Sequence, residues 1–492
     1  MELLENYING EWKPADSSGT LNVENPSTGE VLAQVPLSTT DEANRAIEAA
    51  AAAFPGWSRT PVARRTEYLY SLLEVARRNQ KAIAACIVEE NGKSLGDAIA
   101  EVKRMLENLE VACGMPVLQQ GDKVVGSSFE IDGEVIRQPV GVFTMVTPFN
   151  FPAMVPFWFI PYAIATGNTY VAKPSEQVPR TMQRITRLID DIGLPPGVFN
   201  VVHGDKVVAE AFMNHPAVKG VSFVGTSGVC RIIAERCSAA NKRFQALGSA
   251  KNHLVVMPDA KISEVIRNMI SSCYGCAGQR CMAASAIVCV GDETYNKVRE
   301  EFVEVSKTLP VGNPLDPKLA DDPSVVGPVI SGRAKDKILG LIDEGVREGA
   351  RLALDGRQIT VEGSENGYYI GPTVFTDVKP GMTIHRTEIF GPVVVILKAA
   401  DLDEAIGLVN EHEYGNGASI YTQNGYFARK FKLEANAGMI GINVGIPAPV
   451  AYLPFGGTKS SHFSDIKAQG KSIINFFTEE KIVTERYWRE NG

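Results

Sequence analysis

The sequence predicts an α/β protein with a doubly wound parallel sheet, and three observations lead to that fold class. From Gly141 onward, short apolar runs alternate with segments of helical length, as parallel strands and their crossover helices do. The alternation resumes at Ser263 and predicts a second α/β block. The chain has 492 residues, 45% of them hydrophobic and 22% charged, so it can bury a large core and is neither fibrous nor disordered.

The region before Gly141 begins with strand-like pieces and continues with helices. Asp41 and Glu42 would lie in the first turn of the first helix, where acidic side chains interact favourably with the helix dipole. We expect strands over residues 7–12 and 21–25, and helices over 40–53, 63–79, 81–91 and 94–113.

The first block supplies the strands of the parallel sheet. Ligands of such sheets bind at the carboxyl ends of the strands, so the residues that follow each strand are candidates for binding. We expect strands over 140–146, 169–172, 198–202 and 220–224, with helices over 153–165, 180–189 and 206–214.

The second block reads as a domain of its own. Its expected helices cover 263–274, 292–309, 332–348 and 402–410, and its expected strands cover 286–290 and 368–375. Two further strand-like segments, 130–137 and 473–483, lie outside both blocks. They would pair as an extra sheet or form an oligomer arm.

Composition and charge argue against several classes of function. The formal net charge is -8 and no segment is strongly basic, so we do not expect a nucleic-acid partner. Eight cysteines are too sparse for a disulfide scaffold. The acidic residues 1–5 resemble neither a secretory signal nor an organelle presequence, which predicts a cytoplasmic protein.

Residues 138–172 contain no Asp, Glu, Lys, Arg or His and are numerous enough to span a bilayer. Five prolines interrupt this segment, at positions 139, 148, 152, 156 and 161. Prolines break a helix and would leave backbone groups unsatisfied in lipid. We therefore interpret the segment as buried interior and expect no membrane contact.

Cys273, Cys276, Cys281 and Cys289 lie close together in the sequence, which raises a metal or iron–sulfur site as one interpretation. Their spacing matches no standard ligand pattern and no histidine is near, so we expect no metal. Cys281 differs from the others because it follows Arg280 in a loop, where a neighbouring cation lowers the pKa of a thiol. It is a candidate nucleophile, and a structural cysteine is the alternative.

Asn150 ends an apolar strand between two prolines, where it would serve either as a turn residue or as an amide donor to an oxyanion. Gly225 and Thr226 follow a strand and open a helix, which favours phosphate. Lys173 and Glu176 follow another strand, where they would bind ribose hydroxyls or form a solvated charged loop.

Taken together, these motifs resemble the aldehyde dehydrogenase superfamily over nearly the whole chain and in the order of that family. The resemblance implies Cys281 as nucleophile, Asn150 as oxyanion donor and NAD as cofactor. It also implies that the residues binding NAD are Phe149, Lys173, Glu176, Gly225, Thr226, Glu388 and Phe390. The motifs are Pro148-Phe149-Asn150-Phe151-Pro152, Lys173-Pro174-Ser175-Glu176, Phe223-Val224-Gly225-Thr226, Gly278-Gln279-Arg280-Cys281, Glu388-Ile389-Phe390-Gly391-Pro392 and Pro454-Phe455-Gly456-Gly457.

Finer features resemble one branch, the CoA-acylating methylmalonate and malonate semialdehyde dehydrogenases. In that branch the arginines matching Arg104 and Arg280 hold the substrate carboxylate. The features are Glu101-Val102-Lys103-Arg104, Ala250-Lys251-Asn252-His253, Gly278 to Ala283 and Gly441 to Pro449.

The resemblance implies three parts of an aldehyde dehydrogenase-like fold and a homotetrameric assembly. These parts are an NAD-binding domain (1–124 and 144–250), an α/β catalytic domain (251–440) and a small β oligomerisation arm (125–143 and 470–488).

Two positions depart from the pattern of the superfamily. The general-base Glu of most members is absent, because the matching position holds Leu247, or Ala246 if the alignment slides by one. Cys230 replaces the second Gly of the phosphate turn, where a Cβ would alter the approach of the cofactor.

The implied reaction is the oxidation of methylmalonate or malonate semialdehyde through a Cys281 thioester, which coenzyme A then takes up as propanoyl-CoA or acetyl-CoA with loss of CO2. One alternative is a CoA-independent semialdehyde dehydrogenase that hydrolyses the thioester. Another is a catalytically silent relative with a structural or binding role.

Overall fold

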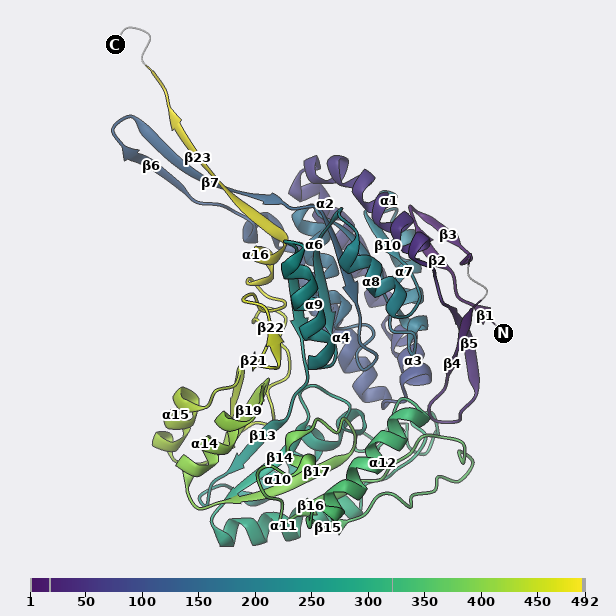
Figure 1. Ribbon diagram of the computed structural model, residues 1–492, viewed down its shortest axis with the longest axis vertical. Coiled ribbons are helices and arrows are strands. Elements are labelled where there is room, and N and C mark those ends of the chain that lie inside the picture. The colour runs from purple at the N-terminus through teal and green to yellow at the C-terminus, as the bar shows by residue number, and fades with distance from the viewer. Residues whose placement is uncertain (1, 17–18, 321, 489–492) are drawn as a thin grey trace.

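Two mostly parallel sheets organise the molecule, one at the centre of each lobe, and a three-stranded arm extends from the upper lobe (Figure 1). The computed structural model describes residues 2–16, 19–320 and 322–488. The proposed first domain thus includes residues 1, 17 and 18, which lie outside the described part of the chain.

The upper sheet has a parallel centre with antiparallel strands at both edges. The chain order of its parallel strands reverses between β8 and β11, and such a switch point is where open α/β sheets bind ligands. Its spatial order is β22 (His462–Phe463), β12 (Arg243–Leu247), β11 (Val218–Val224), β8 (Val142–Val146), β9 (Thr169–Lys173), β10 (Phe199–Val201), β2 (Asn6–Ile8) and β3 (Glu11–Lys13).

Helices cover both faces of this sheet, as a doubly wound fold requires. Apolar residues of α1 (Thr40–Arg59), α8 (Lys206–Asn214) and α9 (Ser227–Ala239) form the core of one face. The other face is covered by α2 (Val62–Arg78), α3 (Gln80–Asn91), α4 (Leu95–Cys113), α5 (Met115–Leu118), α6 (Ile160–Thr166) and α7 (Pro179–Asp191).

The long helix predicted over 153–165 is wrong in its first half. The segment forms a short 3-10 helix, η1 (Pro156–Trp158), and then α6. Pro156 and Pro161 each stand in the first turn of one of these helices, because a proline lacks the N–H group that a helix interior needs. The residues of α6 are all buried, in line with the interpretation of this charge-free stretch as interior.

The lower sheet is the predicted second α/β block. Of the strand predicted over 368–375, only the end forms a strand, β16. The start of the segment does not join the sheet, because Tyr368 donates its backbone N–H to the carbonyl of Pro26. The strand order is β15 (Arg351–Leu354), β16 (Thr373–Thr376), β17 (Val393–Ala399), β14 (Ala284–Val290), β13 (Asn252–Val256), β19 (Gly417–Tyr421) and β20 (Met439–Ile442). Around it pack α10 (Ile262–Tyr274), α11 (Asp292–Lys307), α12 (Gly332–Arg347), α13 (Thr383–Arg386), α14 (Leu402–Glu411) and α15 (Gly425–Glu434).

The two strand-like segments outside the blocks do pair. β7 (Ile131–Pro139) lies between β6 (Lys123–Ser128) and β23 (Thr478–Arg486) in an antiparallel arm. The prediction of a strand from residue 473 is wrong at its start, because α16 (Ile473–Phe477) buries four apolar side chains in the upper lobe. Two minor sheets complete the fold: β1 (Glu2–Leu3), β5 (Val31–Pro36) and β4 (Thr20–Glu24), and β18 (Tyr414–Gly415) with β21 (Thr458–Lys459). Among the described residues, no helix is long and apolar enough to cross a membrane.

Candidate active site

Cys281 lies in the loop between α10 and β14, as the sequence predicts, and the backbone before it is unusual. The turn η2 (Gly275–Gly278) places Cys276 and Ala277 in left-handed conformations, with φ of 52° and 53°. Such conformations cost free energy in residues with a Cβ and concentrate at functional sites. A Cβ at Gly278 would stand 2.1 Å from the carbonyl oxygen of Gly391, so only glycine lets this loop pack on the 388–392 segment.

Two asparagines that the sequence reasoning did not single out fix the backbone of Cys281. Asn252 and Asn416 donate from their Nδ2 atoms to the Cys281 carbonyl oxygen at 2.8 and 2.9 Å. Asn252 is the first residue of β13, and Asn416 immediately precedes β19. In the sheet, β13 lies next to β14, and β19 lies on the other side of β13. Asn252 lies in the Ala250-Lys251-Asn252-His253 feature, which assigned it no role, and Asn416 has no signal beyond an amide residue near the start of an apolar strand.

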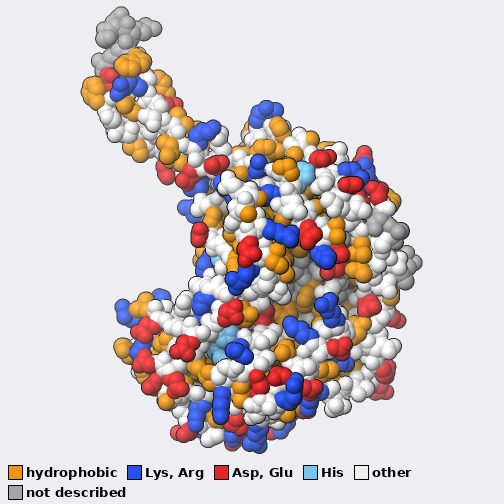
Figure 2. Space-filling model, viewed as in Figure 1, with side chains coloured by type: hydrophobic (Ala, Val, Ile, Leu, Met, Phe, Trp, Pro, Cys, Tyr) orange, Lys and Arg blue, Asp and Glu red, His pale blue; other side chains and the backbone are white. Residues whose placement is uncertain are grey.

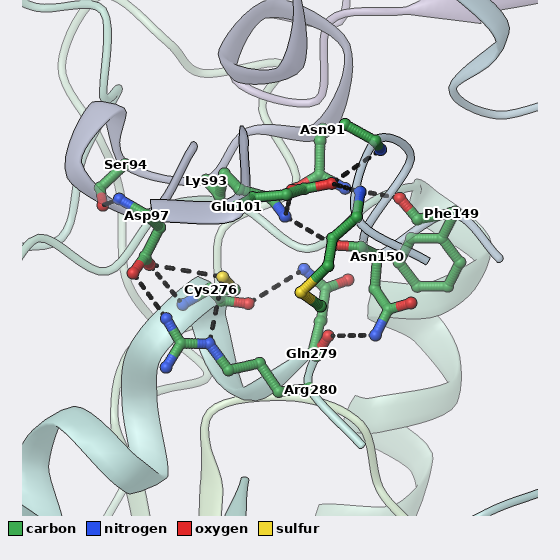
Figure 3. Close-up of polar contacts among 12 residues, drawn as sticks. Asn91, Lys93, Ser94, Asp97, Glu101, Phe149, Asn150, Cys276, Gln279 and Arg280 are labelled. Carbon is green, nitrogen blue, oxygen red and sulfur yellow. Dashed lines mark hydrogen bonds and ion pairs between the residues drawn. The ribbon is translucent and has the colours of Figure 1, made fainter. Parts of the chain in front are cut away.

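The Asn150 side chain reaches the same loop from the other lobe. It follows β8 at the switch point, is buried, and donates from Nδ2 to the carbonyl oxygen of Gln279 at 3.0 Å (Figure 3). The fold thus brings the predicted amide donor to within two residues of the predicted nucleophile. The structure places Asn150 beside the reacting loop and not in a solvated turn.

One cavity of about 340 Å³ joins the thiol to both predicted substrate arginines. Cys281, Arg104 and Arg280 all line it, and Ile446 and Pro449 of a C-terminal loop form part of its wall. The cavity therefore places two guanidinium groups, the carboxylates of Asp97 and Glu101, and apolar surface around a partly exposed thiol.

The two arginines differ in how firmly they are held. The Arg280 guanidinium donates to Asp97 Oδ1 at 2.5 Å and to the Sγ atom of Cys276 at 3.2 Å (Figure 3). Arg104 pairs with Glu107 at 2.6 Å, and its side chain is 36% exposed. Asp97 was not predicted from the sequence, since a lone acid in a helix usually faces solvent.

Arg280 lowers the pKa of Cys281, as the sequence predicts, but other effects outweigh it and the net shift is upward. Burial of the thiol, and next the charge of Glu388, raise the pKa of Cys281 to about 12. The Arg280 cation lowers it by less, because that guanidinium is already paired with Asp97. The thiol is therefore protonated near neutral pH before ligands bind.

The other cysteines of the group have separate environments. Cys273 and Cys289 are buried in α10 and β14, and Cys276 donates from Sγ to Asp97. Within the described residues, no group of three or more His, Cys, Asp or Glu side chains is arranged to hold a metal ion.

Five of the seven residues predicted to hold a dinucleotide follow or end strands at the carboxyl edge of the upper sheet, namely Phe149, Lys173, Glu176, Gly225 and Thr226. Lys173 is buried at the end of β9 and donates from Nζ to the Gly204 carbonyl at 2.6 Å and to Glu176 at 3.0 Å. Glu176 keeps 38% of its side chain exposed. Gly225 and Thr226 end β11 and begin α9, and Thr226 makes no capping bond with its side chain.

This edge fits a dinucleotide. The N-terminus of α9 attracts an anion, and a Cβ built on Gly228 in its first turn meets no atom within 4 Å, so a phosphate group has room to approach. The partly exposed Glu176 carboxylate has the acceptor oxygens that ribose hydroxyls need. Cys230 is fully buried in the core under α9, so its Cβ does not face this site.

Glu388 and Phe390 belong to the segment on which the Cys281 loop packs. The Phe390 ring meets the Phe149 ring edge to face, with centroids 5.8 Å apart. Glu388 accepts the backbone N–H of Ala250 at 2.9 Å, and burial raises its pKa to about 7. Lys251 donates from Nζ to the backbone carbonyl of Thr387 at 3.1 Å and so fixes the residue immediately before Glu388.

No carboxylate occupies the position where most of the superfamily carries its general base. Leu247 ends β12 and is 3% exposed, and Ala246 is fully buried in the core beside it. Both registers of the alignment thus place an apolar side chain there.

Known proteins match this chain along nearly its whole length. Residues 12–483 match the aldehyde dehydrogenase family. The malonate-semialdehyde dehydrogenase of Pseudomonas aeruginosa is 44% identical over 487 residues, which cover 99% of this chain and 97% of that protein. Malonate-semialdehyde dehydrogenase 1 of Geobacillus kaustophilus is 43% identical over 486 residues, or 99% of this chain and 98% of that protein.

The chain belongs to the aldehyde dehydrogenase family. Solved structures of the family agree with its fold. The methylmalonate-semialdehyde dehydrogenase of Oceanimonas doudoroffii superposes with a TM-score of 0.96 at 39% identity, covering 100% of this chain and 99% of that one. A Sinorhizobium meliloti protein solved with NAD has a TM-score of 0.96 at 40% identity, with 99% of each chain covered. The aldehyde dehydrogenase-like fold predicted from the motifs is therefore confirmed.

Proposed function

We propose that this protein oxidises malonate or methylmalonate semialdehyde with NAD and transfers the acyl group from Cys281 to coenzyme A, with loss of CO2 to give acetyl-CoA or propanoyl-CoA. The observation that carries the proposal is the single cavity lined by Cys281, Arg104 and Arg280. It sets two guanidinium groups, which pair with carboxylates, beside the reacting thiol. Relatives bearing these substrate names match the chain along its whole length.

Each step of the proposed reaction involves particular residues of the chain. The Cys281 thiol gives up its proton to solvent, the thiolate adds to the aldehyde carbon, and the oxygen that becomes negative accepts a hydrogen bond from the Asn150 amide. The edge that contains Glu176 and Thr226 would hold NAD, which would supply the acceptor for the hydride of that carbon. The carbonyl then re-forms as a thioester, which the CoA thiolate attacks while the Cys281 thiolate leaves. The C–C bond to the substrate carboxylate breaks, CO2 leaves, and the electron pair of that bond stays on the neighbouring carbon, which takes up a proton from solvent.

The acceptor of the acyl group is the feature to test first. Water is a weak nucleophile and needs a base, whereas a few per cent of a thiol is already ionised near pH 7. Because Leu247 and Ala246 are apolar and buried, we expect NADH release with malonate semialdehyde to show a burst and then a slow phase without CoA. Adding CoA should accelerate the slow phase strongly.

The hydrolytic alternative makes the opposite prediction. Glu388, whose pKa is raised to about 7, would then activate water, and burst and steady-state rates would not respond to CoA. A silent relative would give no burst at all, with or without CoA.

Arg104 and Arg280 should determine the substrate class. Losing a charged hydrogen bond costs about 1.5–3 kcal/mol, or about 10- to 150-fold in kcat/KM. Arg104→Met should therefore weaken malonate semialdehyde oxidation by that factor and change propanal oxidation by less than about threefold. Equal losses on the two aldehydes would mean that Arg104 does not bind the carboxylate. Arg280→Met is the weaker test, since that side chain also ties Asp97 and Cys276 together.

NAD should be preferred over NADP. The exposed part of Glu176 would accept a hydrogen bond from a ribose 2′-hydroxyl and repel a 2′-phosphate. We expect kcat/KM for NAD to exceed that for NADP by about 10-fold or more, and Glu176→Gln to narrow the ratio. Equal efficiency with both cofactors in the unaltered protein would contradict this role of Glu176.

We further propose a cytoplasmic homotetramer with an NAD-binding domain (1–124 and 144–250), a catalytic domain (251–440) and an assembly arm (125–143 and 470–488). Within these bounds, β6, β7 and β23 extend away from both lobes, whereas the start of β8 and α16 pack in the upper lobe. The three extended strands and their turn carry exposed apolar side chains (Figure 2), among them Val125, Phe129 and Ile482 at 78, 82 and 79% exposure. Apolar surface of this kind supports burial against other copies of the chain.

A further inference from the structure

An ion pair with no solvent exposure lies behind the Asn150 segment. Lys93 Nζ and Glu101 Oε2 are 2.6 Å apart, and both side chains are 0% exposed. Lys93 precedes α4, and Glu101 lies in its second turn. A buried ion pair contributes little to stability compared with well-packed apolar residues, because both charges must be removed from water. The role of this ion pair must therefore be inferred from the groups that its two side chains contact.

Both members of the pair bind the segment that carries Asn150 (Figure 3). Lys93 donates to the Asn150 carbonyl oxygen at 2.6 Å and lies 4.2 Å from the centre of the Phe151 ring. Glu101 Oε1 accepts the backbone N–H groups of Ala153 at 2.8 Å and Met154 at 3.2 Å. The pair thus holds the segment at Asn150 and on the residues that follow it.

The same helix also holds the loop of the nucleophile. Asp97 lies four residues before Glu101, so the two carboxylates share one face of α4. Asp97 accepts the backbone N–H of Cys276 at 3.1 Å and a guanidinium N–H of Arg280 at 2.5 Å. One helix end therefore fixes both the loop that supplies the amide donor and the loop that supplies the thiol.

We infer that the Lys93–Glu101 pair is a positioning device for the Asn150 amide, which it sets relative to the Cys281 loop. The inference rests on the oxyanion role of Asn150 proposed above. Neither Lys93 nor Glu101 needs to touch the reacting atoms for this role. A displacement of the amide by about 1 Å suffices to slow the chemical step by about 10²-fold.

The test uses the variant Lys93→Met/Glu101→Gln, which leaves no unpaired buried charge. We expect the NADH burst with malonate semialdehyde to slow by about 10- to 100-fold, with the NAD dissociation constant unchanged within about twofold. Adding Asn150→Ala to this variant should slow the burst no further than Asn150→Ala alone, because residues that act through one group are not additive. Should the pair variant fail to fold, Lys93→Gln/Glu101→Gln also removes both charges and keeps an N–H donor and carbonyl acceptors, and a smaller loss with the same non-additivity is expected.

Glu90→Gln is the matched control. Glu90 is also fully buried and accepts two backbone N–H groups, those of Arg180 and Thr181, both at 2.8 Å, at the start of α7. It should lower the melting temperature and leave the burst rate unchanged.

Three outcomes would overturn the inference: an unchanged burst in the pair variant, losses that multiply with Asn150→Ala, or an equal loss in Glu90→Gln. If Asn150→Ala itself keeps a normal burst, the oxyanion assignment fails and the inference with it. A slow Asn150→Ala beside a normal pair variant would remove the inference alone.

Discussion

Cys281→Ala should abolish aldehyde oxidation, with a fall in turnover of at least about 10⁴-fold, and leave NAD binding intact. The thiol lines the cavity that both arginines also line. The side chains of Asn252 and Asn416 fix its loop by their hydrogen bonds to the Cys281 carbonyl. Without the sulfur no covalent intermediate forms, so hydride transfer has no donor. NADH absorbance measures the first effect and calorimetric titration with NAD the second. Near-normal turnover would refute the assignment.

Thiol labelling gives this experiment its control. Because the pKa of Cys281 is raised to about 12, its thiolate is scarce at pH 7 and labelling of the ligand-free protein by iodoacetamide should be slow. The rate should increase about tenfold for each pH unit between 7 and 9, since the thiolate fraction grows in that proportion below the pKa. Cys281→Ala should remove this labelling. If Cys276 alone were labelled, the nucleophile would be misassigned.

The order of strands and helices could be predicted because local pattern and tertiary packing agree in most of the chain. The helix expected over 206–214 is α8 with identical ends, and Asp205 caps it as such residues do. Agreement fails where tertiary contacts override local preference. Ile473–Phe477 has the apolar, β-prone composition of a strand, yet it turns helical to bury its aromatic rings, and Phe143 packs edge to face against Phe477.

The sequence marks candidate site residues where they lie in a motif, as Cys281, Asn150 and Arg280 do, and the structure brings their segments together. A site residue could not be predicted where its partner is distant in the sequence. Asp97 and Asn252 act by bonds to residues 183 and 29 positions away, and the residues around them in the sequence assign no role to either. The pKa of Cys281 could not be predicted because the main cause of its rise is burial of the thiol in the folded chain, followed by the charge of Glu388.

Asn150→Ala should lower kcat by about 10²–10³-fold, the usual loss for one oxyanion donor, with little change in KM. In the ligand-free protein its Nδ2 atom makes one hydrogen bond, to the Gln279 carbonyl. A bond of that kind contributes only about 0.5–1.5 kcal/mol to stability, whereas the expected loss in rate corresponds to about 2.7–4 kcal/mol. Measuring both kcat and stability of Asn150→Ala therefore distinguishes an oxyanion donor from a turn residue, the two roles that the sequence leaves open.

Asn168→Ala is the matched control, because Asn168 is a buried asparagine with a purely structural set of bonds. Its Oδ1 atom accepts the N–H groups of Val140 and Gly141 at 2.8 and 2.9 Å, and its Nδ2 atom donates to Phe477 at 2.7 Å. Asn168→Ala should lower the melting temperature more than Asn150→Ala does, and it should leave kcat unchanged in the folded protein. Asn150→Asp sharpens the contrast, since it keeps the shape and replaces the donor with a carboxylate that repels the developing oxyanion. A turn residue would tolerate aspartate, so a normal kcat in Asn150→Asp, with only the melting temperature reduced, would show that Asn150 shapes the loop and does not stabilise charge.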